Sequence, residues 1–415
     1  MGRPSAGNRT EWYDSPMNYR LPLGAALIAL SALNAQAQSC NGPGPAASVT
    51  IPLPGSPFGV VPSQDGCWLF VSVGGGAAAS GPGVAVLKRA AGKIELVRVV
   101  RVASAPAGMV LTHDGKLLAA AAGSRVVFLD VARMTAGGGD PVLGSMEEPG
   151  VFRGSIYVNV TADDKTLFVS EEGGGAITVI DLERARKEGY RAGAIIGAAP
   201  TGMAPIALTF SPDGKWLYTT SEGAPPDWKW PAACTREGSG DPAIVEPEGA
   251  VVVVDVERAR KNPVDSIAAR VPAGCSPVRA DISPKGDRLF VAARNSNAVV
   301  AFDAAKLVSD GAHARIAVIP VGPAPVPVAV IDGGTKVVAG NSNRFAAPNA
   351  PQTLTVLDAG KLQSGAGAVL GTVQAGAFPR EMRVSADGNT LFFTNAGSNS
   401  LQVLDVKHLP FLPVR

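Results

Sequence analysis

Charged residues that could take part in binding or catalysis alternate with apolar ones in two short stretches. These read VRADIS from Val278 and REMRVS from Arg380. Residues at alternate positions of a β-strand point to the same side, so each stretch would present an acid and a base together. Two further stretches carry polar residues at matching places: Tyr157 and Asn159 in one, and Thr209 in the other. The candidates for one common site are Arg279, Asp281, Arg380, Glu381, Arg383, Tyr157, Asn159 and Thr209.

Such acid–base pairs could bind a ligand. An arginine guanidinium holds a carboxylate through two parallel hydrogen bonds, so the pattern suits an anionic sugar acid or a peptide carboxylate. The simpler interpretation, and the one we favour, is a set of ion pairs that lines a water-filled channel. Both interpretations require these strands to meet at one axis.

A second group of candidates falls in segments predicted to be loops: Glu222, Trp228, Trp230 and Arg344. Trp228 and Trp230 lie two residues apart in an insertion rich in Pro, Gly and Trp. They could stack on a sugar or a peptide, although such residues more often cover a protein's surface. Glu171, Glu172 and Glu222 could form a carboxylate-only calcium site, but their spacing does not support one.

The sequence offers few components for catalysis by histidine. Its three histidines are His113, His313 and His408. His113 falls in a turn between strands and His408 in the C-terminal tail, so neither is expected beside the charged strands. A Ser-His hydrolase or a His-ligated metal site therefore lacks its usual parts. The cysteines have no C-x-x-C spacing, and we predict neither a metal nor a cofactor.

One repeat supplies the elements that position these residues. Its turn, S/T-x-D-G in most copies, begins at seven places: Ser63, Thr112, Thr161, Ser211, Ser283, Ile331 and Ser385. Neighbouring copies are 48 to 54 residues apart, except for one spacing of 72. A period near 50 with strand patterning is typical of β-propellers, in which each repeat is a four-stranded blade. The long spacing contains the insertion, residues 222–248.

Each copy has the same internal order. A Pro usually opens the first strand, the Asp-Gly turn follows, and the second strand is wholly apolar, as a strand buried on both faces should be. The third strand usually ends in Asp, a recurrence that marks turn-formers rather than catalytic acids: Asp130, Asp181, Asp255, Asp303, Asp358 and Asp405. The core-facing positions of the first strands are expected at Val60, Met109, Val158, Leu208, Ala280, Val328 and Met382.

The two ends of the repeat array are expected to meet. The last copy has no fourth strand after Asp405, while residues 48–53 (SVTIPL) form a strand pattern before the first copy. We predict that the N-terminal strand completes the C-terminal blade, because closure removes exposed strand edges. The chain is thus expected to be all-β: one seven-bladed propeller of four-stranded antiparallel blades over 48–409, followed by a tail at 410–415.

The repeat resembles the YVTN-repeat β-propellers. The shared frame is a Pro-led strand, SPDG, a Leu-Tyr/Phe-Val-like strand, Asn-x-x-Ser/Asn and Val-x-Asp, and the best matches are SPDGKWLYTTS from Ser211 and SADGNTLFFTNAGSNSLQVLD from Ser385. The resemblance covers residues 48–406 and implies a fold of the seven-bladed lactonase-like and surface-layer-type superfamily. For function it implies a surface or periplasmic binding protein, a lactonase of the 6-phosphogluconolactonase type, or a relative of cofactor-bearing subunits.

The N-terminus is expected to direct export. Arg20 precedes an apolar run from Leu21 to Leu33, and residues 35–37 (AQA) offer a cleavage site. The run is shorter than the roughly 20 residues that span a bilayer. We predict a signal peptide over 1–37, with Met17 as an alternative start, and a linker over 38–47. A retained membrane anchor and lipidation at Cys40 are minor alternatives.

Export permits disulfides, and the four cysteines allow three pairings. In a propeller, Cys275 would precede a first strand on the face that carries the insertion with Cys234. Cys40 and Cys67 would both lie near the opposite face. We therefore predict the pairs Cys234–Cys275 and Cys40–Cys67, with buried free thiols as the alternative.

The charge balance argues against two classes of partner. The 37 basic and 35 acidic residues give a net charge of +2, which leaves no basic footprint for nucleic acid, and no run of like charges suits a membrane surface. We expect an exported monomer, periplasmic or extracellular, that spans no membrane after the signal is removed. It would bind an unidentified protein or small anionic ligand at its loop face and channel mouth without being an enzyme; the alternative is a lactonase-like hydrolase acting on a sugar lactone.

Overall fold

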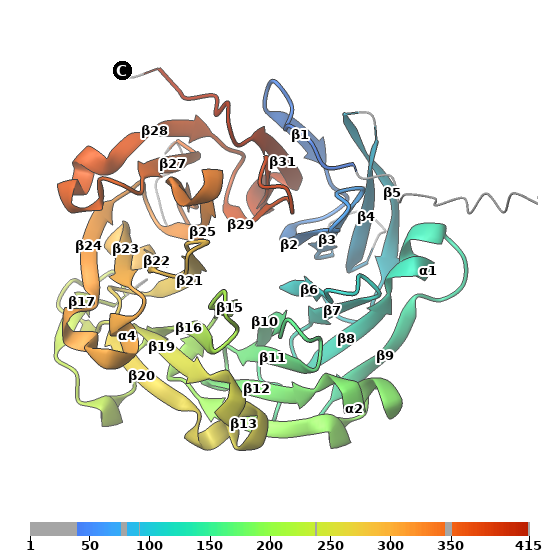
Figure 1. Ribbon diagram of the computed structural model, residues 1–415, viewed down its shortest axis with the longest axis horizontal. Coiled ribbons are helices and arrows are strands. Elements are labelled where there is room, and N and C mark those ends of the chain that lie inside the picture. Colours follow the sequence, from blue (N-terminus) through green and yellow to red (C-terminus); the bar gives the residue numbers. More distant parts are fainter. Residues whose placement is uncertain (1–39, 76–80, 91, 237–238, 345–350, 414–415) are drawn as a thin grey trace, which may run out of the picture. The chain divides into compact units, whose positions relative to one another are not determined.

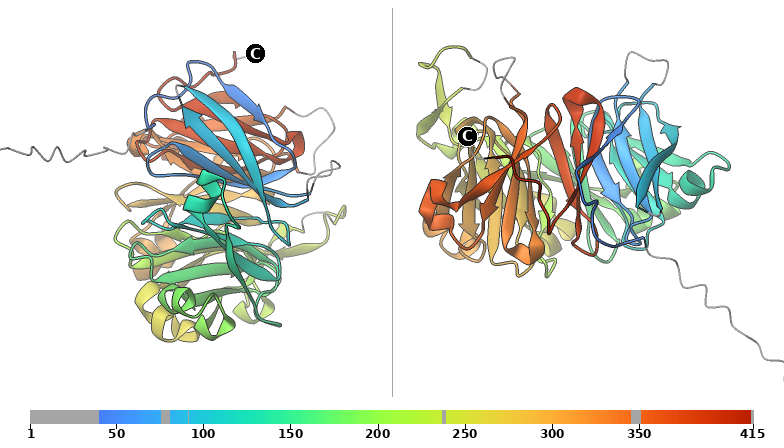
Figure 2. Two further views of the ribbon diagram at one scale, coloured as in Figure 1. Left: turned by 90° about the vertical axis from the view of Figure 1, so that its right-hand side faces the viewer. Right: turned by 90° about the horizontal axis from the view of Figure 1, so that it is seen from above.

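The strands of each repeat pair in sequence order, so that every repeat forms a small antiparallel sheet. The computed structural model describes residues 40–75, 81–90, 92–236, 239–344 and 351–413. In these residues, seven such sheets stand as blades around a central axis (Figure 1). Figure 2 shows the ring from two sides. The predicted all-β, seven-bladed propeller is confirmed.

The first three blades are regular four-stranded meanders. Blade 1 consists of β2 (Pro57–Pro62), β3 (Trp68–Val73), β4 (Gly83–Ala90) and β5 (Lys93–Arg101). Blade 2 consists of β6 (Met109–Leu111), β7 (Leu117–Ala121), β8 (Arg125–Asp130) and β9 (Val142–Glu147). Blade 3 consists of β10 (Ser155–Val160), β11 (Thr166–Glu171), β12 (Ala176–Asp181) and β13 (Ile195–Pro200).

Blade 4 differs because its innermost strand is split and its second and third strands are joined by the insertion. It consists of β14 (Met203–Pro205), β15 (Thr209–Phe210), β16 (Trp216–Gly223), β19 (Ala250–Asp255) and β20 (Ile267–Pro272). Between the two halves, the Ala207 amide donates to the Thr220 hydroxyl at 3.1 Å instead of to a strand carbonyl. Within the insertion, β17 (Ala232–Thr235) and β18 (Val245–Pro247) form a separate hairpin.

The remaining blades return to the regular pattern. Blade 5 consists of β21 (Pro277–Ile282), β22 (Arg288–Ala293), β23 (Ala298–Asp303) and β24 (Arg315–Pro320). Blade 6 consists of β25 (Pro325–Ile331), β26 (Lys336–Asn341), β27 (Thr353–Asp358) and β28 (Val369–Gln374). Blade 7 consists of β29 (Pro379–Val384), β30 (Thr390–Asn395), β31 (Ser400–Asp405) and, from the other end of the described chain, β1 (Val49–Pro52).

The ring closes through β1. This strand pairs antiparallel with β31, with Val49 opposite Val403 and Pro52 opposite Ser400. One more backbone bond, from the Leu53 amide to the Asn399 carbonyl at 2.8 Å, extends the pairing. The predicted closure by the N-terminal strand is confirmed, and it covers the edge of β31 that would otherwise be exposed.

The S/T-x-D-G turn connects the first two strands of a blade through its side chains. In blade 4 the Ser211 hydroxyl accepts the Trp216 amide at 2.9 Å, and Asp213 accepts the Lys215 amide at 3.1 Å. Gly214 has a φ of 71°, a left-handed conformation that glycine adopts without strain. This turn defines the turn face of the ring. The opposite face, which carries the loops that lead into the first strands, is the loop face.

The recurring Asp at the end of the third strand is structural, as predicted. Asp130, Asp181 and Asp255 cap the helices α1 (Val131–Ala136), α2 (Leu182–Lys187) and α3 (Val256–Lys261) by accepting a first-turn amide. Asp303, before α4 (Lys306–Ser309), accepts the Ala305 and Lys306 amides at 3.1 and 3.2 Å. Asp358 and Asp405 accept amides of the residues that follow them.

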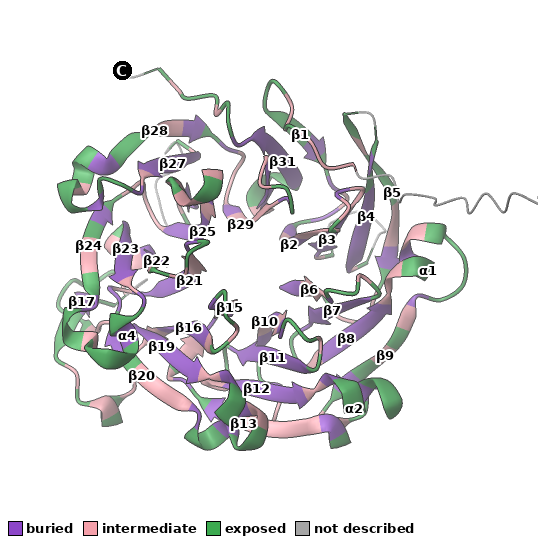
Figure 3. Ribbon diagram, in the orientation of Figure 1, coloured by how far each residue is buried: buried purple, intermediate pink, exposed green. Residues whose placement is uncertain are grey.

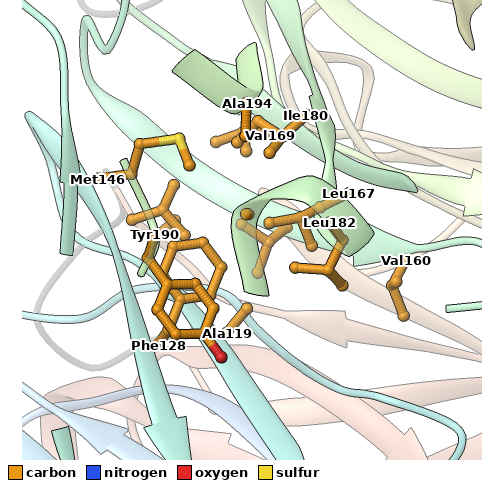
Figure 4. Packing of buried hydrophobic residues seen from close by; sticks show 14 of the residues in the cluster. Ala119, Phe128, Met146, Val160, Leu167, Val169, Ile180, Leu182, Tyr190 and Ala194 are labelled. Atoms are coloured by element: carbon orange, nitrogen blue, oxygen red, sulfur yellow. The ribbon is translucent and has the colours of Figure 1, made fainter. Parts of the chain in front are cut away.

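The core lies between neighbouring blades. Figure 3 shows buried residues along the inner strands and exposed ones toward the rim. Between blades 2 and 3, Phe128 stacks on Tyr190 with ring centroids 4.4 Å apart, beside Met146 and Leu182 (Figure 4). The predicted core positions are buried, except that Ala280 is half-buried and packs against the cluster that contains Val291.

Both predicted disulfides are present. Cys40–Cys67 joins the segment before β1 to the turn between β2 and β3, and Cys234–Cys275 joins β17 to the loop before β21. The described residues contain no free cysteine. The predicted signal peptide lies outside the described residues.

Candidate functional site

The first strands of the blades place matched residues around the axis. The second residue after the opening Pro (Ser155 in blade 3) is small in blades 1, 2 and 4. It is large and polar in blades 3, 5 and 7. In blade order these residues are Gly59, Gly108, Tyr157, Ala207, Arg279, Pro327 and Glu381. Large side chains from three blades therefore extend into space that the small residues leave open.

Tyr157, Arg279, Glu381 and Arg383, here called the axial cluster, contact one another across the channel. Nη2 of Arg279 lies 3.3 Å from Oε2 of Glu381, and Nη2 of Arg383 lies 2.9 Å from Oε1. The Tyr157 hydroxyl donates to Glu381 Oε1 and accepts from Arg383 Nη2. Tyr157, Arg279 and Glu381 are only 4%, 7% and 2% exposed. The buried carboxylate of Glu381 thus contacts two guanidinium groups and one phenol.

Arg279 is also held by aromatic faces. Its guanidinium carbon lies 4.2 Å from the ring centre of Tyr157 and 5.4 Å from that of Phe58. A cation above an aromatic face is attracted by the ring quadrupole. Nε and Nη1 of Arg279 have no hydrogen-bond partner among the described residues. One carboxylate and two aromatic rings therefore hold the Arg279 guanidinium, and two of its nitrogens still have no acceptor among the described residues.

Enclosure and neighbouring charges set the protonation of the axial cluster. Burial raises the pKa of the Tyr157 hydroxyl; the charge of Arg383 opposes this effect and that of Glu381 reinforces it. Enclosure acts to lower the pKa of Arg383, but Glu381, Tyr157 and Asp281 together hold it above its ordinary value. At neutral pH the phenol is therefore neutral and Arg383 is a cation.

A β-bulge brings a third arginine to the same region. The register of β29 against β30 moves from Pro379 opposite Asn395 to Glu381 opposite Thr394, so Arg380 is the extra residue. Such a bulge re-aims the side chain it contains. The Arg380 guanidinium carbon lies 4.3 Å from the ring centre of Phe58, the ring that Arg279 also approaches. Sequence neighbours 380 and 381 thus both reach the axis, which simple alternation does not allow.

Arg380 lacks a counter-ion among the described residues. It stacks on Phe58 and, at 5.1 Å, on Phe378, and its Nε has no hydrogen-bond partner there. Burial, together with the charges of Arg279 and Arg344, lowers the pKa of Arg380 to about 10 against the opposing effect of Glu172. A lowered arginine pKa means that the cation is poorly stabilised where it stands.

Glu222 and Arg344 have different roles at this face. Glu222 forms a bidentate pair with Arg294, at 3.1 and 3.0 Å, and the Arg294 side chain is 5% exposed. The pair links the end of β16 to the end of β22. The positive charge of Arg344 helps to lower the pKa of Arg380. Neither residue joins the axial cluster.

Trp228 and Trp230 lie side by side, and Trp228 lines a separate pocket. Their ring centres are 5.1 Å apart, and the Arg270 guanidinium lies 5.1 Å from the ring of Trp228. Trp228 lines an open pocket of about 710 Å³ together with Arg153 and Arg270. No residue of the axial cluster lines this pocket. The structure therefore does not bring the two tryptophans together with the charged strands.

Asn159 and Asp281 are engaged by neighbouring blades. The Asn159 amide donates to the Leu208 carbonyl at 2.8 Å, and Asp281 Oδ2 accepts the Val330 amide at 2.7 Å. Thr209, at the matching place in blade 4, donates to the Ala280 carbonyl at 2.7 Å. These side chains reach the channel as expected, but their polar atoms hold one first strand to the next.

The acidic loop residues do not assemble a metal site. Glu171 is 1% exposed and accepts the Arg153 amide at 2.9 Å and the Ser155 hydroxyl at 2.8 Å. Burial raises its pKa to about 7 against these hydrogen bonds. Among the described residues, no group of three or more His, Cys, Asp or Glu side chains is placed to hold a metal ion. The calcium site near Glu171, Glu172 and Glu222 is therefore not assembled in that part of the chain.

The histidine side chains are exposed, and each lies beside an aspartate away from the axial cluster. Nδ1 of His113 is 2.8 Å from Asp164, that of His313 is 2.9 Å from Asp310, and that of His408 is 3.2 Å from Asp405. Each of these partners belongs to a turn or cap rather than to the channel.

Two aromatic residues of the site are absent from the predicted set. Phe58 and Phe378 provide the faces on which Arg279 and Arg380 lie. Phe58 follows Pro57 just as Arg380 follows Pro379. The aligned repeats therefore contained the signal for Phe58, whereas Phe378 precedes the repeat's opening Pro and had none.

Comparisons with known proteins inform the fold. No protein-family model matches the chain, and no curated protein matches it in sequence. Among solved structures, the chain is similar to the hydrazine synthase of Kuenenia stuttgartiensis, with a TM-score of 0.62 and 19% identity over 86% of this chain and 97% of that chain. At this identity the similarity supports the fold alone. Membership of the YVTN-repeat family stays a prediction. The described residues form no helix long and apolar enough to cross a membrane.

Proposed function

We propose that this protein is an exported, non-enzymatic β-propeller that binds an anionic ligand at the channel mouth on its loop face. The observation that carries the proposal is Arg380, a half-buried guanidinium that forms no ion pair with a described residue. Removing a charge from water is costly unless it is paired. An anion supplied by a ligand would complete this site.

The charges around Arg380 favour the same kind of ligand. Arg279 and Arg383 share the single carboxylate of Glu381, and Arg294 is matched by Glu222. The mouth therefore retains more positive than negative charge. A carboxylate suits arginine because its two oxygens match the planar guanidinium donors. A sugar acid and the C-terminus of a peptide share this chemistry.

Two observations support export. The apolar run from Leu21 to Leu33 has signal-peptide length, and both cysteine pairs are joined as disulfides. Disulfides persist mainly outside the reducing cytosol. A soluble propeller outside the cytosol would meet small organic acids and peptides directly.

A lactonase-like hydrolase acting on a sugar lactone is the second candidate. The raised pKa of Glu171, about 7, favours it, because a carboxyl that titrates near neutral pH can act as a general base. However, both hydrogen bonds of Glu171 hold the loop at Arg153 and Ser155 in place. A substrate could reach this carboxyl only if that loop moved, so binding is the preferred role.

Calorimetric titration tests the binding proposal. The ligands are gluconate, a short peptide with a free C-terminal carboxylate, and the same peptide amidated. Arg380→Met removes the charge while keeping an unbranched side chain, and Arg270→Met, beside Trp228, is the matched control. We expect at least about tenfold weaker carboxylate binding in Arg380→Met and no change in Arg270→Met. No saturable binding of either carboxylate, or binding that Arg380→Met leaves unchanged, would refute the proposal.

The hydrolase candidate is tested in parallel. Hydrolysis of gluconolactone is followed for the wild type, for Glu171→Gln and for Glu381→Gln. Turnover above the buffer rate that disappears in one of these variants would favour the hydrolase. A wild-type protein that is inactive on a range of sugar lactones would count against it.

A further inference from the structure

The turn-face half of the channel forms a chamber of its own. This cavity has a volume of about 500 Å³ and is lined by residues from the first strands of the blades. Exposed Gln64 and His113 belong to its rim, so the chamber reaches the surface at the turn face. Its volume lies within the roughly 300–1,000 Å³ that is usual for small-molecule sites.

The wall of the chamber carries apolar side chains beside its polar groups. Half-buried aliphatic and aromatic side chains from different blades line it: Val61, Leu111, Phe210, Ile282, Val330 and Val384. These residues are half-buried rather than buried because the channel leaves one side of each open. Apolar surface in contact with water gains free energy when a ligand covers it. This part of the wall therefore suits an apolar ligand body.

Three polar residues of the chamber are engaged, whereas Arg383 retains unused donors. Asn159, Thr209 and Asp281 are engaged by backbone groups of the next blade. Arg383 bonds to Tyr157 and Glu381 through Nη2, and Nη1 makes one long bond of 3.4 Å to the Met382 carbonyl. A guanidinium carries five N–H donors. The Arg383 side chain is 40% exposed although protein surrounds it, because it borders the open chamber.

The chamber is distinct from the mouth at Arg380. Beside the axial cluster, the remaining cavity lined by Tyr157, Arg279 and Glu381 has a volume of only about 30 Å³. That is enough for about one or two water molecules, not for an organic ligand. Arg380 does not line the chamber. A ligand in the chamber would thus meet Arg383 from the side opposite to the loop face.

We propose that the chamber is a second binding site, for a small organic acid with an apolar body, whose carboxylate pairs with Arg383. The proposal does not depend on anion binding at the mouth. Among the described residues, Asp281 is the one carboxyl that lines the chamber, and each of its oxygens already accepts a backbone amide, at 2.9 and 2.7 Å. Arg383, which retains unused donors, is the better partner for a charged ligand.

Octanoate is the probe. Its controls are 1-octanol, which has the body without the charge, octylamine, which reverses the charge, and acetate, which lacks the body. We expect saturable binding of octanoate to the wild type, measured by calorimetry. All three controls should bind at least about tenfold more weakly, since both charge and body contribute.

Three variants locate the probe. Arg383→Met removes the charge, and Val330→Phe fills the chamber without removing any charge; each should weaken octanoate binding at least about tenfold. Arg380→Met, at the mouth, should leave it unchanged. Because Arg383 also pairs with Glu381, Val330→Phe keeps the test valid if Arg383→Met proves unstable. The proposal fails if the wild type does not bind octanoate, if Val330→Phe binds it as the wild type does, or if octylamine binds better. Loss in Arg380→Met alone would assign the probe to the mouth and overturn the chamber site.

Discussion

Gly108 of blade 2 lies against the ring of Tyr157 in blade 3. A Cβ atom added at position 108 would overlap the ring atoms Cδ2 and Cε2 of Tyr157. The two strands approach closely here, and the Gly108 amide donates to the Ile156 carbonyl at 2.9 Å. The glycine is thus required for the tyrosine to reach Glu381 at the axis.

Gly108→Ala should therefore disturb the axial cluster. The added methyl must displace the Tyr157 ring, and overpacking of a well-packed interior costs about 1–3 kcal/mol. Urea unfolding measures this loss. Gly138→Ala is the matched control, because nothing lies within 4 Å of a Cβ at that loop position. Equal stability of the two variants would show that the close contact between Gly108 and Tyr157 does not affect the free energy of unfolding.

Glu381→Gln tests the charge balance at the axis. The substitution leaves Arg279 and Arg383 facing each other without their shared carboxylate. Removing one partner of a buried ion pair typically costs about 3–5 kcal/mol, so we expect the free energy of unfolding to fall by about this amount. Tyr157→Phe, which removes only the hydroxyl that bridges Glu381 and Arg383, should cost less.

The control for this prediction is an exposed ion pair. Glu183 and Lys187 lie 2.9 Å apart on the surface of α2, where solvent screens the charges. Glu183→Gln should leave stability almost unchanged. A Glu381→Gln protein as stable as Glu183→Gln would mean that the axial arginines are stabilised by solvent rather than by the carboxylate.

The sequence predicted the frame of this site better than its contacts. Sevenfold alignment identified which first-strand residues reach the axis, because every blade repeats the same register. It also separated recurring Asp residues from unusual charges, and ring closure followed from a missing strand. The disulfides followed from which loops share a face.

The pairing of side chains across the channel could not be read in the same way. Tyr157 and Glu381 are 224 residues apart, and their contact depends on the glycines that neighbouring blades present. The bulge at Arg380 breaks the period of two on which strand predictions rest. Arg380 and Phe58 each lie at the irregularity of their own first strand, and they meet across the seam between blades 7 and 1. These relationships come from packing between blades, which no single repeat encodes.

Glu171 gives a testable pH dependence. Its carboxyl has an ordinary pKa of 4.5 when unfolded and about 7 in the fold. The folded protein then binds more protons than the unfolded chain between these values, so this residue's contribution to stability is full below pH 4.5 and is lost as pH rises to 7. The loss amounts to about 3 kcal/mol. Glu171→Gln should remove it, so the variant gains stability relative to the wild type as pH increases from 4.5 to 8.

Asp332 provides a control of opposite sign. Hydrogen bonds from Lys407 and Lys336 lower its pKa to about 2. Its contribution is present above pH 3.8 and is lost as pH falls toward 2. Asp332→Asn should therefore differ from the wild type equally at pH 5 and pH 8. If the stability difference between Glu171→Gln and the wild type is also constant over that range, the Glu171 carboxyl does not titrate there.

Removing each of the two disulfides should have a different effect on the protein. In the described residues, Cys234–Cys275 joins the hairpin β17–β18 to the ring, and the Asn295 side chain donates to the Thr235 carbonyl at 2.7 Å. An isolated two-stranded hairpin is marginally stable. Replacing Cys234 and Cys275 with serine should therefore expose this hairpin to limited proteolysis while the ring stays folded.

Cys40–Cys67 instead secures the closure of the ring. It holds the segment before β1 to blade 1, while β1 itself belongs to blade 7, so the link spans the seam between the first and last blades. The cysteines are 27 residues apart, and the loop-entropy estimate for such a link is about 3–4 kcal/mol. Replacing Cys40 and Cys67 with serine should lower the unfolding midpoint of the whole domain in urea, with no new cleavage in β17–β18. The opposite result would contradict this prediction: the whole domain is destabilised when Cys234 and Cys275 are replaced but not when Cys40 and Cys67 are replaced. In that case the pairing of β1 with β31, without the disulfide, would stabilise the seam.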